Sequence, residues 1–100
     1  MNFNDLKGSL TDDTPPKGIS KLCKAMWYDA RGDWETAHQI AQSVDSKDGS
    51  WVHAYLHRKE GDLSNASYWY HMAGRTMPET SLEKEWEDIA LELIKTCMED

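Results

Sequence analysis

The sequence predicts an all-α fold of five helices, and three observations favour it. Apolar residues recur at helical spacing from Ile19 onward, and no stretch alternates apolar and polar residues over the length of a strand. Gly-Asp steps at Gly32 and Gly61 separate consecutive periodic segments. The order of the segments predicts two helical hairpins followed by one C-terminal helix, and a chain of 100 residues is expected to form one domain.

The first 17 residues are predicted to be an extended or loosely docked leader. In the stretch TDDTPPKG, Pro15 and Pro16 block a helix and the flanking Asp and Thr residues favour turns. Phe3, Leu6 and Leu10 would let the leader lie across the surface, but apolar residues at such spacing also occur by chance. Docking of the leader therefore stays open.

The first hairpin is predicted from residue 18. A helix over about 18–31 carries one apolar face, formed by Ile19, Leu22, Cys23, Met26, Trp27 and Ala30. Gly32 can adopt the left-handed conformation that ends a helix, and Asp33 can accept amide protons at the start of the next. The second helix carries Trp34, Ala37, Ile40, Ala41 and Val44, and it stops at DSKDGS, a run of turn formers that includes Gly49.

The second hairpin is predicted to copy the first at a shift of 29 residues. Its first helix starts near Ser50, and Gly61-Asp62 opens a helix that runs to about Arg75. Aligning the Gly-Asp steps superposes apolar positions throughout, including Leu22 on Trp51, Cys23 on Val52, Ala25 on Ala54, Met26 on Tyr55, Trp27 on Leu56, Ala37 on Ala66 and Ile40 on Trp69. Because the turn and the small residues also coincide, the hairpins are interpreted as one repeated unit.

The second copy resembles a tetratricopeptide-type helix-turn-helix repeat. The resemblance rests on Ala54, Gly61-Asp62-Leu63, Ala66, Tyr70, Ala73 and Pro78. In that family, small residues at the Ala positions let paired helices approach closely, and the Pro closes the second helix. The first copy departs from the pattern, with Ala41 in place of Tyr70 and Gly49 in place of Pro78. The resemblance implies a groove lined by the first helix of each repeat and a role in binding peptides.

The last segment is predicted to be a fifth helix that caps the second repeat. Its apolar stripe consists of Leu82, Trp86, Ile89, Ala90, Leu93, Ile94 and Cys97. A terminal amphipathic helix of this kind shields the end of a helical array from water. The predicted organisation is a leader over 1–17 and one domain over 18–100, with repeats at 18–46 and 47–78 and the capping helix at 79–98.

Charge and composition argue against several functions. The net charge is −7, and residues 79–100 hold eight acidic and two basic residues, so a nucleic-acid partner is not expected. No apolar run approaches the roughly 18 residues that a membrane span needs, and the N-terminus has no signal-peptide pattern. We expect a cytoplasmic protein without a membrane partner. Cys23 and Cys97 show no zinc-site spacing and are expected to be reduced packing residues.

No catalytic motif is recognised in the chain, so neither an enzyme nor a cofactor is expected. The leading hypothesis is a protein-interaction scaffold whose groove contains Trp51, Tyr55, Arg58 and Lys59. Aromatic and Arg side chains often dominate interfaces, and the paired cations would favour a partner with an acidic segment. The aromatic pair can instead be core, and the cations can be merely solvated. The acidic C-terminal helix can either compete for Arg58 and Lys59 within the molecule or flank the groove, and the sequence does not decide which.

Two further functions remain as alternatives. His53 and His57 are four residues apart on one helix face and can hold a transition metal if a third ligand, such as His71 or Glu60, lies nearby. The more ordinary roles of these histidines, and of His38 and His71, are hydrogen bonding between helices or a polar position that faces solvent. The remaining alternative is a structural subunit whose aromatic surface serves self-association.

Overall fold

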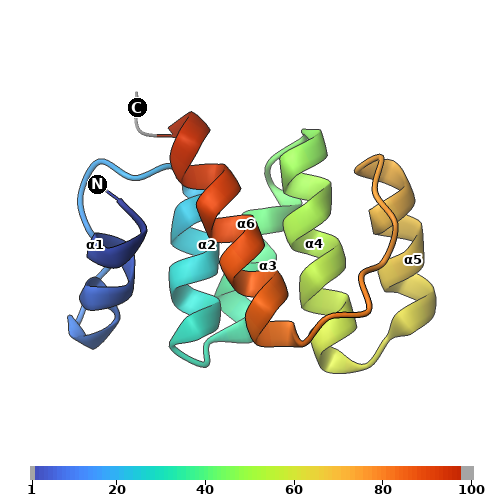
Figure 1. Ribbon diagram of the computed structural model, residues 1–100, viewed down its shortest axis with the longest axis horizontal. Coiled ribbons are helices and arrows are strands. Elements are labelled where there is room, and N and C mark those ends of the chain that lie inside the picture. Colours follow the sequence, from blue (N-terminus) through green and yellow to red (C-terminus); the bar gives the residue numbers. More distant parts are fainter. Residues whose placement is uncertain (1, 98–100) are drawn as a thin grey trace.

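The structure is all-helical. It is a computed structural model that describes residues 2–97, with side chains for residues 2–95, and every regular element in this part is a helix. In chain order these are α1 (Phe3–Gly8), the short 3-10 helix η1 (Ser9–Thr11), α2 (Lys21–Ala30), α3 (Trp34–Gln42), α4 (Lys47–Glu60), α5 (Leu63–Met72) and α6 (Leu82–Cys97) (Figure 1). The all-α prediction is confirmed, but the described chain contains six α-helices, so the prediction of five is wrong. None of these helices has both the length and the apolarity that crossing a bilayer requires.

The additional helix, α1, forms in the leader that the sequence predicts to be extended or loosely docked. The side chain of Asn2 accepts a hydrogen bond from the amide of Asp5 at 2.8 Å, and the carboxylate of Asp5 accepts one from the amide of Asn2 at 3.0 Å. This reciprocal cap satisfies amides that a helix start leaves without partners, and it stabilises a helix of only six residues. The non-helical backbone around Pro15 and Pro16 agrees with the sequence.

The leader is docked against α2 and α6. Leu6 has no exposed surface, and the indole nitrogen of Trp27 donates a hydrogen bond to the carbonyl of Ser9 at 3.2 Å. The ring of Phe3 lies 6.1 Å from the ring of Trp86 on α6. The leader is therefore docked, a point that the sequence left open. Burial of Leu6 stabilises this arrangement, because it removes a whole aliphatic side chain from water.

The two hairpins share the same turn geometry. Gly32 and Gly61 have φ of +85° and +91°, a conformation that side chains with a Cβ rarely adopt. Asp33 and Asp62 follow them, and each carboxylate accepts a hydrogen bond from the amide three residues later. Each Gly-Asp step therefore ends one helix and caps the next, as the sequence predicts.

Small residues lie where the paired helices pack. The aligned alanines all have no exposed surface; they are Ala25, Ala37, Ala54 and Ala66. The most extensive helix pairs in the fold are α4 with α5 and α2 with α3. Cys23 is buried in the same core, whereas the side chain of Cys97 lies outside the described residues. The core of the two hairpins therefore includes a fully buried methyl group from each of the four helices.

Helix α4 begins at Lys47, three residues before the predicted start at Ser50. The hydroxyl of Ser46 accepts a hydrogen bond from the amide of Gly49 at 3.0 Å, which caps the helix. Gly49 therefore lies inside the first turn of α4 and does not belong to a stop signal. A Cβ at this position would collide with the carbonyl oxygen of Val44, so the close approach of the preceding loop requires glycine.

Helix α6 packs on both hairpins, whereas the sequence analysis placed it on the second one. It crosses the face formed by α2 and α4, while α5 forms the far edge of the molecule (Figure 1). Its buried side chains include Trp86, Ile89 and Leu93, and the indole of Trp86 donates to the carbonyl of Met26 on α2 at 3.1 Å. The apolar stripe of α6 therefore packs on the first helix of each hairpin, α2 and α4.

Candidate functional site

The four side chains predicted to line the groove all lie on the side of α4 that α6 covers or borders. Trp51 and Tyr55 are buried, with 6% and 2% of their surfaces exposed. Arg58 is largely covered and Lys59 is partly exposed. The sequence left open whether Trp51 and Tyr55 line a groove or belong to the core. The structure has both side chains in the core beneath α6.

A carboxylate from α6 occupies the place where an acidic partner was expected. Glu85 is 2% exposed, and its oxygens accept hydrogen bonds from the indole of Trp51 at 3.2 Å and the guanidinium of Arg58 at 2.8 Å. The hydroxyl of Tyr70 on α5 lies 2.7 and 2.6 Å from the same two oxygens. We call Trp51, Arg58 and Tyr70 the carboxylate seat. The seat combines an ion pair with two neutral donors, so it recognises a carboxylate by both charge and direction.

A second buried carboxylate lies beside the seat, on α2. Asp29 is 2% exposed; it accepts a hydrogen bond from the hydroxyl of Tyr55 at 2.8 Å and pairs with the ammonium of Lys59 at 2.9 Å. Burial raises the pKa of both Tyr55 and Tyr70 above the ordinary value of 10, and the neighbouring carboxylates Asp29 and Glu85 add to the shift. Both tyrosines therefore act as hydroxyl donors over a wide pH range.

Helix α6 divides the expected groove into two cavities. One, of about 650 Å³, is lined by residues that include Trp51, Arg75, Glu85 and Leu91. The other, of about 410 Å³, is lined by residues that include Asp29, Tyr55, Lys59 and Trp86. In the larger cavity, the guanidinium of Arg75 lies 3.4 Å from the ring centre of Trp51. Trp51, Tyr55 and Lys59, three of the four predicted groove residues, therefore line one of these two hollows.

The opposite side of α4 carries a cluster of three histidines. His38 comes from α3, and His53 and His57 come from α4; one ring nitrogen from each lies within 4.8 Å of the others. The Nε2 atoms of His38 and His53 are 3.0 Å apart. The indole rings of Trp34 and Trp69 stack on His38 and His53, with ring centres 4.8 and 4.1 Å apart.

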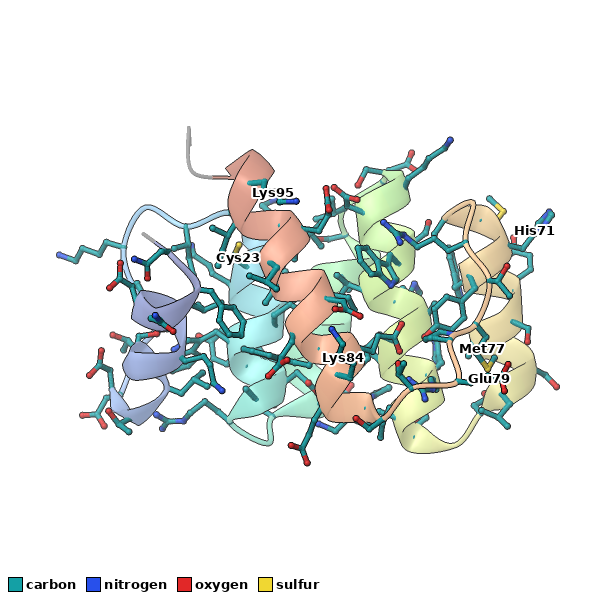
Figure 2. All side chains as sticks on the ribbon, viewed as in Figure 1. Cys23, His71, Met77, Glu79, Lys84 and Lys95 are labelled. Atoms are coloured by element: carbon teal, nitrogen blue, oxygen red, sulfur yellow. The ribbon has the colours of Figure 1, made fainter. Side chains whose placement is uncertain are left out.

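The third histidine is not one that the sequence analysis proposed. His71 is exposed on α5 and points away from the molecule (Figure 2), so it is not part of the cluster. Glu60 does reach the cluster, through a 2.6 Å contact between its carboxylate and Nδ1 of His57. His38 lies one helical turn after Trp34, on the same side of α3. Its place beside His53 and His57 follows from the packing of α3 on α4. The order of the hairpins in the sequence is the signal that could have suggested this packing.

Burial shifts His38 and His53, two members of the cluster, toward the neutral form. Desolvation, followed by repulsion from His38 and His57, lowers the pKa of His53 from 6.5 to about 4. Burial and the neighbouring His57 also lower the pKa of His38. At neutral pH these two rings are therefore uncharged, and one donates the hydrogen bond that joins them.

Comparisons with protein-family models, curated proteins and solved structures found no match to the chain. The likeness to tetratricopeptide repeats therefore stays a resemblance, based on the residues quoted above. The carboxylate seat, the two cavities and the histidine cluster are the features from which a function can be inferred.

Proposed function

We propose that the protein is a non-enzymatic, tetratricopeptide-like interaction module that binds an acidic amphipathic helix of a partner on its α2–α4 face. The observation that carries this proposal is the carboxylate seat. Trp51, Arg58 and Tyr70 converge on one carboxylate, and the segment that supplies it is itself an acidic amphipathic helix. A cytoplasmic location belongs to the same proposal.

The proposal requires the partner to take the place of α6. Apolar side chains of α6 such as Ile89 and Leu93 are fully or almost fully buried, and Glu85 adds a buried anchor at the seat. A partner helix with one acidic side chain and an apolar stripe in the same register would make the same set of contacts. The chemistry that recognises such a helix is therefore already present on α2, α4 and α5.

The affinity of the α2–α4 face for a partner helix is set by competition with α6, which already covers that face. Because α6 is joined to α5 by a short connection, its effective concentration at the face is high, on the order of millimolar for a short flexible linker. A free helix with the same contacts binds weakly to the intact protein. Weakening the anchor of α6 should therefore increase the binding of an added helix.

The test uses a fluorescent synthetic peptide with the sequence of residues 79–95, added to the full-length chain. We expect weak binding to the wild type and tighter binding to Glu85→Gln, because the variant loses the ion pair that holds α6 on Arg58. Adding Arg58→Ala to Glu85→Gln should abolish the gain. Lys47→Ala, which removes an exposed cation at the other end of α4, is the control and should leave binding unchanged.

Two results would overturn the proposal. One is the absence of peptide binding to Glu85→Gln, and the other is binding that Arg58→Ala does not alter. Light scattering on the same variants tests the alternative of self-association, because α6 exchanged between two copies would double the mass. A dimer of Glu85→Gln that excludes the peptide would assign the face to a second copy of this chain.

A further inference from the structure

The three histidines between α3 and α4 lie close enough together for one ring nitrogen of each to reach a single metal ion. A tetrahedral zinc ion with Zn–N bonds of about 2.05 Å holds its ligand nitrogens about 3.3 Å apart. The nitrogens of His38 and His53 are already 3.0 Å apart, and that of His57 lies within 4.8 Å of both. We propose that His38, His53 and His57 form a binding site for a divalent transition-metal ion of the zinc type.

Glu60 orients one of the three ligands. Its carboxylate lies 2.6 Å from Nδ1 of His57, and a carboxylate can only accept there, so Nδ1 carries the proton. The Nε2 atom of His57 is then the nitrogen that offers a lone pair. A carboxylate behind a histidine in this way is the usual outer partner of a metal ligand, and it fixes the tautomer and increases the basicity of the ring.

Aromatic packing holds the other two rings in place. Trp34 lies nearly parallel to His38, with an angle of 10° between the rings, and Trp69 stacks on His53 at 23°. Because the rings are held before an ion arrives, less conformational freedom is lost on binding. His38 is partly exposed, and a cavity of about 130 Å³ borders His53, so an ion has a path from solvent.

The donor set decides the class of metal. Three imidazole nitrogens suit Zn²⁺, Ni²⁺ and Cu²⁺, whereas Ca²⁺ and Mg²⁺ prefer oxygen ligands. Three protein ligands leave the fourth tetrahedral position for water or a ligand atom. The competing explanation is a hydrogen-bonded cluster without a metal. The hydrogen bond between His38 and His53 accounts for two of the three rings. A divalent ion would account for all three, because each ring can supply one ligand nitrogen.

The metal site and the α2–α4 face are separate features. Trp51 and Tyr55 precede His53 and His57 by two residues each, which is about 200° around a helix. The histidines therefore face α3 while the aromatic pair faces α6. The failure of either proposal leaves the other intact.

The experiment is a calorimetric titration of the full chain with Zn²⁺ alone, after removal of bound metal with EDTA and dialysis. We expect one equivalent of Zn²⁺ to bind and the melting temperature to rise, because the ion binds only the folded chain. His38→Gln should lose the stoichiometric binding, and His71→Gln, which changes an exposed histidine outside the cluster, should bind as the wild type does. Mg²⁺ should give no binding.

Glu60→Gln provides a second variant that does not disturb the core, because its side chain is 38% exposed. It should weaken Zn²⁺ binding by about 10–100-fold with an unchanged melting temperature of the metal-free protein. This variant decides the question if His38→Gln fails to fold. The proposal is overturned if the wild type binds no Zn²⁺, if folded His38→Gln binds it unchanged, or if Glu60→Gln has no effect.

Discussion

Helix α4 has two buried polar faces, and they solve the problem of burial in different ways. Toward α6, the carboxylates Glu85 and Asp29 are matched by cationic side chains and tyrosine hydroxyls. Toward α3, the rings of His38 and His53 are stacked on indoles, and their pKa values are lowered. The comparison shows two ways of burying ionisable groups against one helix. On one side the charged groups are paired, and on the other side the neutral form of the group is favoured.

The largest effect is expected from breaking the charged face. Glu85→Ala would leave the Arg58 guanidinium largely buried without its carboxylate, and losing one member of such a pair costs about 3–5 kcal/mol. Urea denaturation measures the change. Glu83→Ala removes an exposed carboxylate from the same helix and should change the free energy of unfolding by less than about 0.5 kcal/mol. Equal losses of unfolding free energy in the two variants would show that the buried Glu85 contributes no more to stability than the exposed Glu83.

A second large effect is expected where the leader supports α2. Leu6→Ala should cost about 2–5 kcal/mol, because the fully buried side chain would leave a cavity. Asn4→Ala, at an exposed position of α1, is the matched control. The free energies of unfolding from urea titrations of the two variants are compared. A loss below about 0.5 kcal/mol for Leu6→Ala would mean that α1 contributes little to stability.

A smaller effect is expected at the packing of α4 against α5, which supports both faces. Ala66 has no exposed surface, so Ala66→Leu should overpack the crossing and cost about 1–3 kcal/mol. Ser67→Leu, next to it but exposed, should melt close to the wild type. Thermal unfolding followed by circular dichroism distinguishes the two. If Ala66→Leu melts like Ser67→Leu, the aligned alanines do not mark a close helix approach.

The groups on the two faces should also reduce the stability of the fold at opposite ends of the pH scale. Because the folded pKa of His53 is about 4 and the unfolded value 6.5, the unfolded chain binds more protons between them, and stability falls as the pH drops through this range. Tyr55 and Tyr70 keep their protons in the fold, so stability falls as the pH rises above 10, where unfolded tyrosine ionises.

Denaturant midpoints measured with EDTA at a series of pH values test this contrast. His53→Gln should flatten the acid limb alone, and Tyr55→Phe should reduce the alkaline limb alone, whereas His71→Gln serves as the control for a histidine outside the cluster. An acid limb that His53→Gln leaves unchanged would assign the loss of stability to other groups.

Local signals in the sequence predicted the hairpins well. The Gly-Asp steps and Ala25, Ala37, Ala54 and Ala66 were readable because turn conformation and close approach each demand one residue type. Helix α1 was missed because six residues are too few to show a period, although Asn2 and Asp5 formed a readable cap. The site of α6 was not readable, since an apolar stripe does not specify which of two apolar faces it covers.

The candidate sites show the same division. The sequence left open whether Arg58 is solvated, meets an acidic partner or meets the acidic C-terminal helix, and it did not single out Glu85 as the residue that pairs with it. A hydrogen bond between helices was an expected role of His38, but its choice as the third ring beside His53 and His57 depends on how the hairpins stack. Contacts between distant elements depend on the three-dimensional arrangement, which one sequence does not display.

The bond from Trp86 to Met26 joins residues 60 positions apart, whereas each hairpin closes through a short turn. Contacts of such different range form at different times, so the hairpins are expected to fold first and α6 to dock last. The reverse step, release of α6 with the hairpins intact, is then a partial unfolding that leaves the rest of the core in place. Amide exchange in α6 should accordingly be faster than in α4, and its rate reports how often the α2–α4 face is open to another molecule.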